Sequence, residues 1–483
     1  MQDTQAIEVA KREGHAPVLE SARETESGII WAEKTADGHR LAVAASAADG
    51  HQVTRSALRA ERLRELLPNL RPVPLGTSAS AGFGDRLGLA TPGHADALRA
   101  CSADGRIGAI FAQQSMRENA RTGRTPQSVL DDATIGAFLC GWEHPVGADA
   151  DHLKTTADID LCLEAGYSFF TIDPGDHVET TADDLRGSEL QQAFDNSVPW
   201  EQLETTPQEL KAALADTDTD LDGFRIRFGP GDLERAAVKY GAAVAHVVTM
   251  ARHLQAQARH GVELEVSVDE TASPTTLAEH FFIASELTRL GVSWVSLAPR
   301  FVGAFEKGVE YRGDLQALAA DLRGHARIAR EFGNYKLSLH SGSDKFMVYP
   351  VANHAAQGQI HLKTAGTSYL EALRVIGMFE PGLLHEIAEL AQERFAEEVK
   401  TYQISGRLEN MPDPATLPGT AVSALLEHVD ARQVLHVTFG SALTRYGDRI
   451  RTVIAAHEQA YRDALRRHFE RHLAPFATAG SDS

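Results

Sequence analysis

Histidine and carboxylate side chains recur at the carboxyl ends of short apolar segments in this chain. Four segments, SFFTID, VELEVSVDET, YKLSLH and QIHLK, each read as a buried β-strand that ends in reactive groups. The groups in or just after them that could bind a metal or transfer a proton are Asp173, His177, Glu270, His340 and His361. Random placement would scatter these residue types over helix surfaces, so their shared position indicates one common site.

The three histidines among these residues, His177, His340 and His361, predict a metal site. Neutral imidazole is a good ligand for Zn, Ni, Mn or Fe, and three histidines leave coordination positions for substrate oxygens. For any one of them the alternative is a hydrogen-bonded structural role. No local motif such as His-Glu-x-x-His is present, so the prediction requires a fold that brings the strand ends together.

Two adjacent acids end the second of these segments. Asp269 and Glu270 are neighbours on a predicted strand, so their side chains should point to opposite faces and only one should reach the interior. We favour Glu270, which lies at the loop boundary beside Thr271.

Basic residues near the strand ends predict a substrate with a carboxylate or a phosphate. Lys345 and Lys363 follow the two histidine-bearing strands, and Arg300 follows the segment that ends in LAP. A solvated surface amine is the alternative for each lysine. The glycine-rich stretch after the first predicted strand offers two further substrate contacts, Asp85 and Arg86.

The elements that would position these groups alternate between short apolar strands and amphipathic helices. Strands are predicted at about 73–76, 107–113, 168–173, 262–269, 292–298, 335–340, 358–363 and 433–438. Parallel strands need crossover connections, and eight strands favour a closed barrel over an open sheet. The prediction is an α/β protein, a (β/α)8 TIM-type barrel whose active site lies at the carboxyl ends of the strands.

The predicted barrel occupies residues 71–475 and follows a small α/β extension over residues 1–70. In the extension, GIIWAEKTADGHRLAVAAS reads as two strands around a turn at 36–38, and residues 55–67 read as a helix. The stretches 174–230 and 403–432 are too long for minimal loops, and we expect them to be lid-like or disordered.

Composition excludes several classes of protein. Acidic residues outnumber basic ones by 67 to 47, giving a formal charge of −20, which disfavours nucleic acid and anionic membranes as partners. The sequence contains no stretch of about 18 consecutive apolar residues, so no membrane span is predicted. The N-terminus lacks a signal-like apolar segment, and Cys101, Cys140 and Cys162 fit neither a zinc pattern nor a disulfide framework. We expect a cytoplasmic enzyme with a small-molecule substrate, and a homo-oligomer is left open.

In its motifs the chain resembles the tagaturonate epimerase family of hexuronate catabolism. The resemblance spans about residues 70–450 and is carried by FGDRLGLATPGH, FAQQSMREN, FTIDPGDHV, VSVDET, LSLHSGSDKF and QIHLKTAGTSYLEALR. It implies a barrel enzyme that interconverts D-tagaturonate and D-fructuronate with a divalent metal ion. It also implies that Asp173 and Glu270 are the acid/base pair, and that His177, His340 and His361 are the metal ligands.

The two sugar acids differ at a carbinol carbon β to the ketone, whose hydrogen the carbonyl does not acidify. Two routes remain: retro-aldol cleavage followed by re-addition, and β-elimination of water followed by re-addition. We favour the first, in which the metal stabilises the enediolate. A metal-dependent sugar-acid aldolase or ketose isomerase on the same barrel is the enzymatic alternative. A non-catalytic sugar-acid-binding barrel is the other, although a binder would not need paired acids.

Overall fold

The computed structural model describes residues 14–477 apart from 27, 37, 47–52, 222 and 365, together with residues 8, 10 and 11. Its centre is a closed barrel of parallel strands in the order β5-β6-β7-β8-β11-β12-β13-β14. These strands are β5 (Ser80–Phe83), β6 (Gly108–Ser115), β7 (Val146–Leu153), β8 (Phe169–Ile172), β11 (Glu263–Val268), β12 (Ser296–Pro299), β13 (Lys336–Leu339) and β14 (Ile360–Thr364). The predicted TIM-type barrel is confirmed.

Helices connect successive barrel strands, as parallel pairing requires. They are α3 (Thr91–Ala100), α4 (Met116–Thr122), α5 (Pro126–Leu139), α6 (Thr156–Ala165), α9 (Asp232–Gln257), α10 (Leu277–Arg289), α11 (Leu315–Glu331) and α12 (Val348–Ala356), and the last barrel helix, α13 (Thr367–Phe379), follows β14. Threonines precede several of them: the side chains of Thr125, Thr155 and Thr276 each accept a hydrogen bond from the backbone N–H of the third helical residue. The side chain of that residue accepts the threonine N–H in return, which completes a capping box. None of the described helices is long and apolar enough to span a bilayer.

Two of the predicted barrel strands are wrong. The stretch 73–76 is not a strand, and the barrel begins at β5; the stretch 433–438 falls in α15 (Val429–Val437) and its C-cap. The prediction also missed β7, whose sequence VGADADHL carries acids at the positions that face the barrel interior. A strand with a polar inner face has no apolar run, so periodicity alone could not find it.

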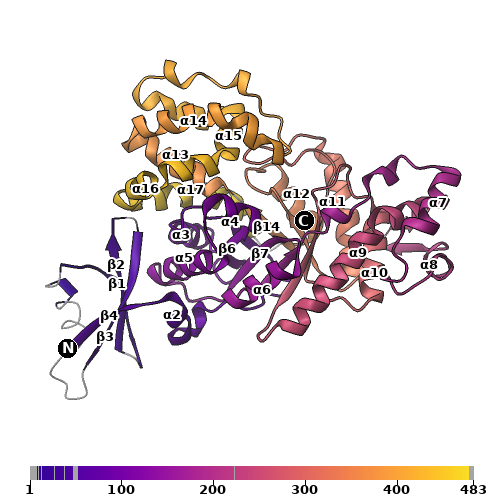
Figure 1. Cartoon of the computed structure of the whole chain (residues 1–483), viewed down its shortest axis with the longest axis horizontal. Coiled ribbons are helices and arrows are strands. Elements are labelled where there is room, and N and C mark those ends of the chain that lie inside the picture. The colour runs from indigo at the N-terminus through magenta and orange to yellow at the C-terminus, as the bar shows by residue number, and fades with distance from the viewer. Residues whose placement is uncertain are drawn as a thin grey trace.

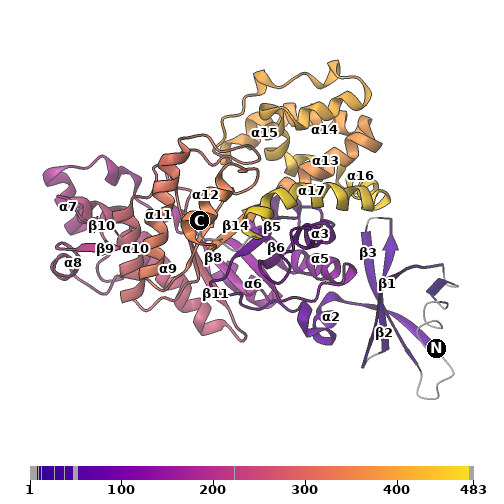
Figure 2. The same cartoon turned by 180° about the vertical axis from the view of Figure 1, so that it is seen from behind.

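The N-terminal extension is an antiparallel sheet of β1 (Ala16–Thr25), β2 (Gly28–Thr35), β3 (Gly38–Ser46) and β4 (Val53–Leu58). The two predicted strands correspond to β2 and β3; of their predicted turn, residue 37 lies outside the described residues. The predicted helix at 55–67 is partly wrong, because β4 runs to Leu58 and the helix α2 spans only Ala60–Leu66. The sheet lies at one end of the long axis of the molecule (Figures 1 and 2).

The long stretch after β8 forms ordered structure at the opposite end of the molecule (Figure 1). It contains the short 3-10 helices η2 (Gly175–His177) and η3 (Thr180–Asp183) and the helices α7 (Gly187–Ser197) and α8 (Pro207–Leu214). A hairpin of β9 (Asp218–Leu221) and β10 (Phe224–Arg227) ends it and packs through Leu221 and Ile226 against α10 and α11. The prediction of a covering lid for this stretch stays a prediction.

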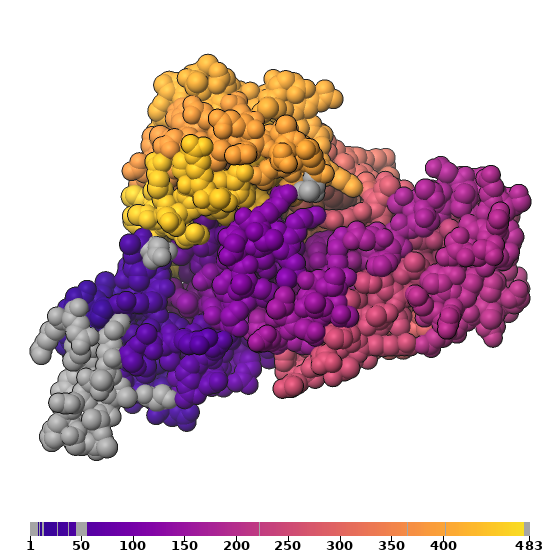
Figure 3. Space-filling view, viewed as in Figure 1, coloured from indigo at the N-terminus to yellow at the C-terminus, as the bar shows by residue number. Residues whose placement is uncertain are grey.

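A layer of helices follows the last barrel helix and covers one side of the barrel (Figures 1 and 3). It consists of α14 (Pro381–Glu398), α15, α16 (Phe439–Ala456) and α17 (Glu458–Ala477), with the short 3-10 helices η4 (Val399–Thr401), η5 (Leu408–Asn410), η6 (Pro414–Thr416) and η7 (Gly419–Leu426) between α14 and α15. The helix α17 packs along α3 and α13, so the last helix lies against the first and the last helices of the barrel.

Candidate active site

The interior of the barrel is polar, whereas barrels of this type are usually filled by branched apolar side chains. At its centre lies the ammonium of Lys363, from β14. Its Nζ is 2.9 Å from Asp149 Oδ2, 2.7 Å from Asp151 Oδ1 and 2.8 Å from Glu265 Oε1, and it donates to Thr171 Oγ1 at 2.7 Å. Burial alone would lower the pKa of Lys363, but the three carboxylates raise it well above its usual value. The lysine therefore neutralises part of a buried acidic cluster.

His340 lies next to this cluster, directly after β13. Its Nε2 is 2.7 Å from Glu265 Oε1, and its Nδ1 is 3.2 Å from Asp269 Oδ1. The ring is almost fully buried, and although burial opposes the charge, Asp269 and Glu265 raise the pKa of His340. His340 was predicted as a metal ligand, and the structure places it at the carboxyl end of the barrel strands.

A second histidine, His152, faces His340 with ring centroids 5.0 Å apart. Its Nδ1 is 3.2 Å from Asp173 Oδ2 and its Nε2 is 3.8 Å from Asp151 Oδ1. Burial opposes protonation, but Asp151 and the hydrogen bond to Asp173 raise the pKa of His152 to about 10. His152 has a φ of +53°, in a strand whose pairing with β8 is irregular between Ala150 and Leu153. Such strained, bulged positions cluster at functional sites.

Two acids predicted to be catalytic meet at His152. The ligand atoms of His152, Asp173 and Glu270 all lie within 4.8 Å of one another. Asp173 is buried and accepts the Gly175 N–H at 2.8 Å, whereas Glu270 is exposed and pairs with Arg117 at 3.2 Å. The structure thus brings together two side chains that lie far apart in the sequence.

The expected choice between Asp269 and Glu270 does not arise, because both lie at the site. The strand β11 ends at Val268, so strict alternation no longer governs the two residues. Asp269 is held by His340 and by the hydroxyl of Ser267, which donates to it at 2.5 Å, while Glu270 turns toward His152.

Two overlapping groups of side chains could hold a metal ion. The first is Asp151, His152 and His340, and the second is His152, Asp173 and Glu270; within each group the ligand atoms lie within 4.8 Å of one another. Imidazole with carboxylates is a donor set that suits divalent first-row metals. The residues present therefore fit a divalent cation, with His152 common to both groups.

The other two histidines predicted as ligands belong to neither group. His361 lies inside the barrel, where its Nδ1 is 2.8 Å from Ser80 Oγ and its ring is fully buried against Phe169. His177 is exposed on η2 and stacks on His246 of α9, with ring centroids 4.1 Å apart. His152, which belongs to both groups, was not singled out from the sequence because its strand was not predicted.

A third group, Asp344 with His468 and His472, has similar geometry, but Asp344 and His472 are already engaged in other bonds. Arg432 donates to Asp344 Oδ2 at 2.8 Å. His472 accepts the Asp344 N–H through Nε2 at 3.0 Å and donates from Nδ1 to the His468 carbonyl at 2.9 Å. This cluster therefore joins α15 and α17 to the loop after β13.

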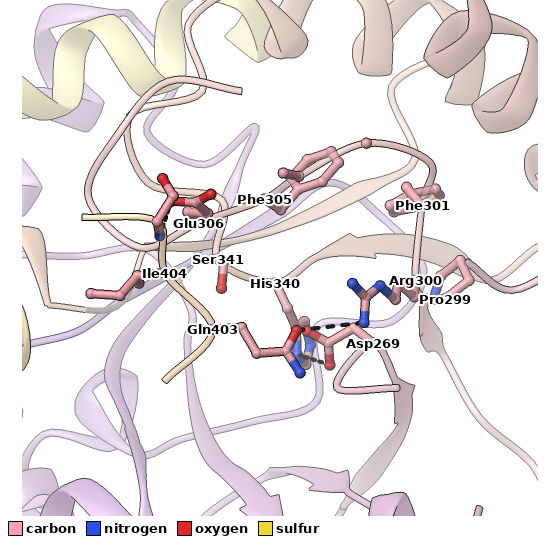
Figure 4. Close-up of a pocket in the computed structure, with 13 residues that line it drawn as sticks. Asp269, Pro299, Arg300, Phe301, Phe305, Glu306, His340, Ser341, Gln403 and Ile404 are labelled. Carbon is pink, nitrogen blue, oxygen red and sulfur yellow. Dashed lines mark hydrogen bonds and ion pairs between the residues drawn. The ribbon is translucent and has the colours of Figure 1, made fainter. Parts of the chain in front are cut away.

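Next to His340 and Asp269 the structure has a pocket of about 310 Å³ (Figure 4). Its other walls are the loop after β12, which includes Arg300 and Glu306, and the segment that contains Gln403 and Ser405. Of the two stretches predicted to be lid-like, only that at 403–432 contributes residues to the lining. Arg300, predicted as an anion contact, therefore lies in the wall of this pocket.

The remaining predicted substrate contacts lie in supporting positions. Lys345 is fully buried, and its Nζ donates to the carbonyls of Glu306, Val309 and Ser343 at 2.7, 2.5 and 2.8 Å. It therefore joins the loop after β13 to the loop after β12. Because all three hydrogens of its ammonium are used, it has none left for a substrate.

Asp85 and Arg86 are likewise buried in supporting roles. The Asp85 carboxylate accepts three backbone N–H groups, from Leu87, Gly88 and Ala90. The Arg86 guanidinium pairs with Glu118 at 2.5 Å and lies 3.5 Å above the ring of Phe439. They fix the loop after β5 and its contact with α16. The sequence indicates that these two residues follow a barrel strand. It does not show whether their side chains stabilise the loop or contact the substrate.

Comparison with known proteins gives a consistent result. A family model described as tagaturonate epimerase (UxaE) matches residues 20–476. A tagaturonate/fructuronate epimerase of Thermotoga maritima is 40% identical over 415 residues, which are 86% of this chain and 84% of that protein. The native crystal structure of the fructuronate-tagaturonate epimerase UxaE from Cohnella laeviribosi superposes with a TM-score of 0.89 at 32% identity, covering 98% of this chain and 99% of that one. A glycerol complex of the same Cohnella enzyme matches equally well.

The family resemblance seen in the sequence motifs is confirmed by these matches, which extend over nearly the whole chain. This chain belongs to the tagaturonate epimerase family and is an enzyme of the epimerase class.

Proposed function

We propose that this enzyme interconverts D-tagaturonate and D-fructuronate by a metal-assisted retro-aldol and aldol sequence. The observation that carries the proposal is the meeting of His152, Asp173 and Glu270 within 4.8 Å, beside His340 and a pocket that contains Arg300. The family match supports the substrate pair, and the donor set supports a divalent cation.

The chemistry of the two sugar acids limits the route. The inverted carbon is β to the ketone, so its hydrogen is not acidic. In the proposed route a base removes the hydroxyl proton of that carbon, its bond to the neighbouring α carbon breaks, and the electron pair moves into an enediolate. The fragments are the enediolate of dihydroxyacetone and a three-carbon hydroxy-aldehyde acid. Rotation of the aldehyde and re-addition on its other face form the epimeric alkoxide, which takes up a proton.

Asp173 and Glu270 are the proposed acid/base pair. One carboxylate removes the hydroxyl proton, and the other, which starts protonated, gives a proton to the new alkoxide. One proton thus passes from one carboxyl group to the other in each turnover, and the roles exchange in the reverse direction. Glu270 is exposed, so the pair can return to its starting state through solvent, while Asp173 is held by Gly175 and His152.

His152 and His340, with the neighbouring carboxylate of Asp151, are the residues that would hold the metal ion. When bound, a divalent ion of the Zn, Ni, Mn or Fe class supplies Lewis-acid stabilisation to the enediolate. Lys363 holds Asp151 and Glu265 in place beneath the two histidines. Arg300 would pair with the substrate carboxylate at the other side of the pocket.

The test is conversion of tagaturonate by the purified protein after chelation and after addition of single divalent ions, with fructuronate measured directly. Activity that disappears with chelator and returns with one metal is expected. No conversion with any ion would reject the proposed reaction. The route is tested in ¹⁸O-water: label at the inverted carbon in a single turnover, with carbonyl exchange controlled, would reject retro-aldol cleavage and favour dehydration.

An aldolase that releases its fragments is the nearest alternative. It would accumulate dihydroxyacetone and the aldehyde acid, whereas an epimerase must retain both until the bond forms again. Reduction of reaction mixtures with borodeuteride, followed by mass analysis, separates the two outcomes. We expect trapped fragments only at the level of the enzyme concentration.

A further inference from the structure

The substrate pocket has one wall that comes from outside the barrel. Gln403, Ile404 and Ser405 line it, opposite the loop after β12 (Figure 4). They belong to residues 402–405, here called the strap, which lie between η4 and η5 in the C-terminal helical layer. The strap is therefore the only part of that layer that lines this pocket among the described residues.

The strap is fixed at both ends, by a side chain of α4 and by a side chain of the loop after β12. Before it, Arg121 of α4 donates to the Tyr402 hydroxyl at 2.9 Å. After it, the Ser405 N–H and hydroxyl both donate to Glu306 Oε2, at 2.9 and 2.7 Å. Glu306 is on the loop after β12, so this bond joins the two walls of the pocket. The backbone on either side of Gln403 is held in place without any contribution from the Gln403 side chain.

The Gln403 amide itself is weakly engaged. Its Oε1 accepts from Arg300 Nη1 at 3.5 Å, which is at the outer limit for a hydrogen bond, and Figure 4 shows this oxygen turned toward the guanidinium. No other side-chain hydrogen bond of Gln403 or of the Arg300 guanidinium is found in the described part of the chain. A firmly placed backbone thus presents an amide with unused donors beside a guanidinium with unused donors.

The charges that line the pocket favour an acid as the group that Gln403 and Arg300 bind. Asp269 and Glu306 are the lining carboxylates and are bonded to His340 and Ser405 respectively, whereas Arg300 has no carboxylate partner in the described chain. A planar guanidinium binds a carboxylate through two parallel N–H donors. A neutral amide beside it can add a donor to the same group without repelling it.

We propose that Gln403 is a specificity-determining residue that binds the carboxylate end of the substrate together with Arg300. The substrate carboxylate replaces the long contact between the two side chains, so that the Gln403 Nε2 donates to a carboxylate oxygen or to the hydroxyl next to it. This inference rests on the proposed function, because it takes a hexuronate as the substrate. It makes the C-terminal helical layer a contributor to substrate selection.

Two variants of similar size test it in the metal-loaded full-length enzyme. Gln403→Met removes the amide, and we expect KM for tagaturonate to rise about ten- to hundred-fold, since hydrogen bonds to charged groups are worth that much, with a much smaller change in kcat. Gln403→Glu places an anion beside Arg300. We expect it to lower the preference for tagaturonate over D-tagatose, its neutral counterpart, in kcat/KM by at least about ten-fold.

The control is Gln257→Ala, at the exposed end of α9, which should change neither quantity. Unchanged KM in Gln403→Met together with an unchanged acid preference in Gln403→Glu would overturn the inference, and melting curves show whether each variant is folded. If the wild-type enzyme does not convert tagaturonate, the proposed function fails. Calorimetric titration of tagaturonate then decides about Gln403: weaker binding by the variants supports its role, and equal binding overturns it.

Discussion

Three buried histidines make the folded state sensitive to acid, and their contribution can be calculated. Burial lowers the pKa of His94 and of His472 from 6.5 to about 3, and that of His468 to about 4. His472 is held neutral by its bonds, since Nε2 accepts the Asp344 N–H and Nδ1 donates to a carbonyl. The unfolded chain therefore binds protons near pH 6.5 that the folded chain does not bind until the pH is far lower.

The sign follows from that difference. A histidine whose pKa is lower in the folded state contributes stability above pH 6.5, and this stability is lost as the pH falls toward the folded value. Between about pH 7.5 and about pH 5.5 the loss is RT ln(11/1.1), about 1.4 kcal/mol for each residue and about 4 kcal/mol for the three together. His472 should thus account for about 1.4 kcal/mol of the pH dependence.

The assay is urea unfolding at both pH values for the wild-type enzyme, His472→Gln and a control, His354→Asn. Glutamine retains an amide that can accept the Asp344 N–H but cannot titrate; His354 is exposed on α12. We expect the pH-dependent part of the unfolding free energy to be about 1.4 kcal/mol smaller in His472→Gln than in the other two proteins. An equal pH dependence in all three would refute the reasoning, whatever the absolute stabilities.

Three further substitutions test the site. Glu270→Gln should lower kcat by about 10²–10⁴ while metal content measured by mass spectrometry is unchanged, and near-normal turnover would remove Glu270 from the mechanism. His152→Ala should weaken metal affinity at least about ten-fold, whereas the same substitution at His177 should not; equal metal affinity of the two variants would contradict the revised ligand set. Lys363→Met leaves three buried carboxylates without their cation and should lower the free energy of unfolding in urea by about 3–5 kcal/mol. This loss should become smaller at lower pH, because the carboxylates become protonated. A loss under about 1 kcal/mol would show that this lysine does not hold the cluster.

The barrel could be predicted because its middle strands are apolar and regularly separated by helices. β11, β12, β13 and β14 were found within a few residues of their bounds. The strand β7 was not, because its inner positions are occupied by Asp149 and Asp151, which face Lys363 and not an apolar core. The same physical cause hid His152: a residue can be recognised as a strand-end ligand only if its strand is recognised first.

The predicted site residues fall into two groups: those whose position follows from the barrel alone, and those whose contacts depend on a distant part of the chain. Asp173, Glu270 and His340 lie at strand ends, and the barrel rule alone brings them together. Lys345 also follows a strand end, but the carbonyls that take its hydrogens belong to a loop some forty residues earlier. Whether a buried lysine meets a substrate or a carbonyl is decided by the tertiary path of that loop, and no local pattern records it.

The C-terminal helices are part of the site's construction, although the barrel would be complete without them. The loop that follows His340 contains Ser341 and Asp344 with φ of +50° and +60°, a conformation that side chains other than glycine rarely adopt. Arg432 of α15 and His472 of α17 hold Asp344 in that conformation. The same helical layer supplies the strap across the pocket. A loop strained in this way stays in position only while its surroundings hold it. The position of the loop after His340 and the closure of the pocket therefore both depend on the packing of the C-terminal helices. The barrel supplies the reactive side chains, and the helical layer determines the shape of the space in which they act.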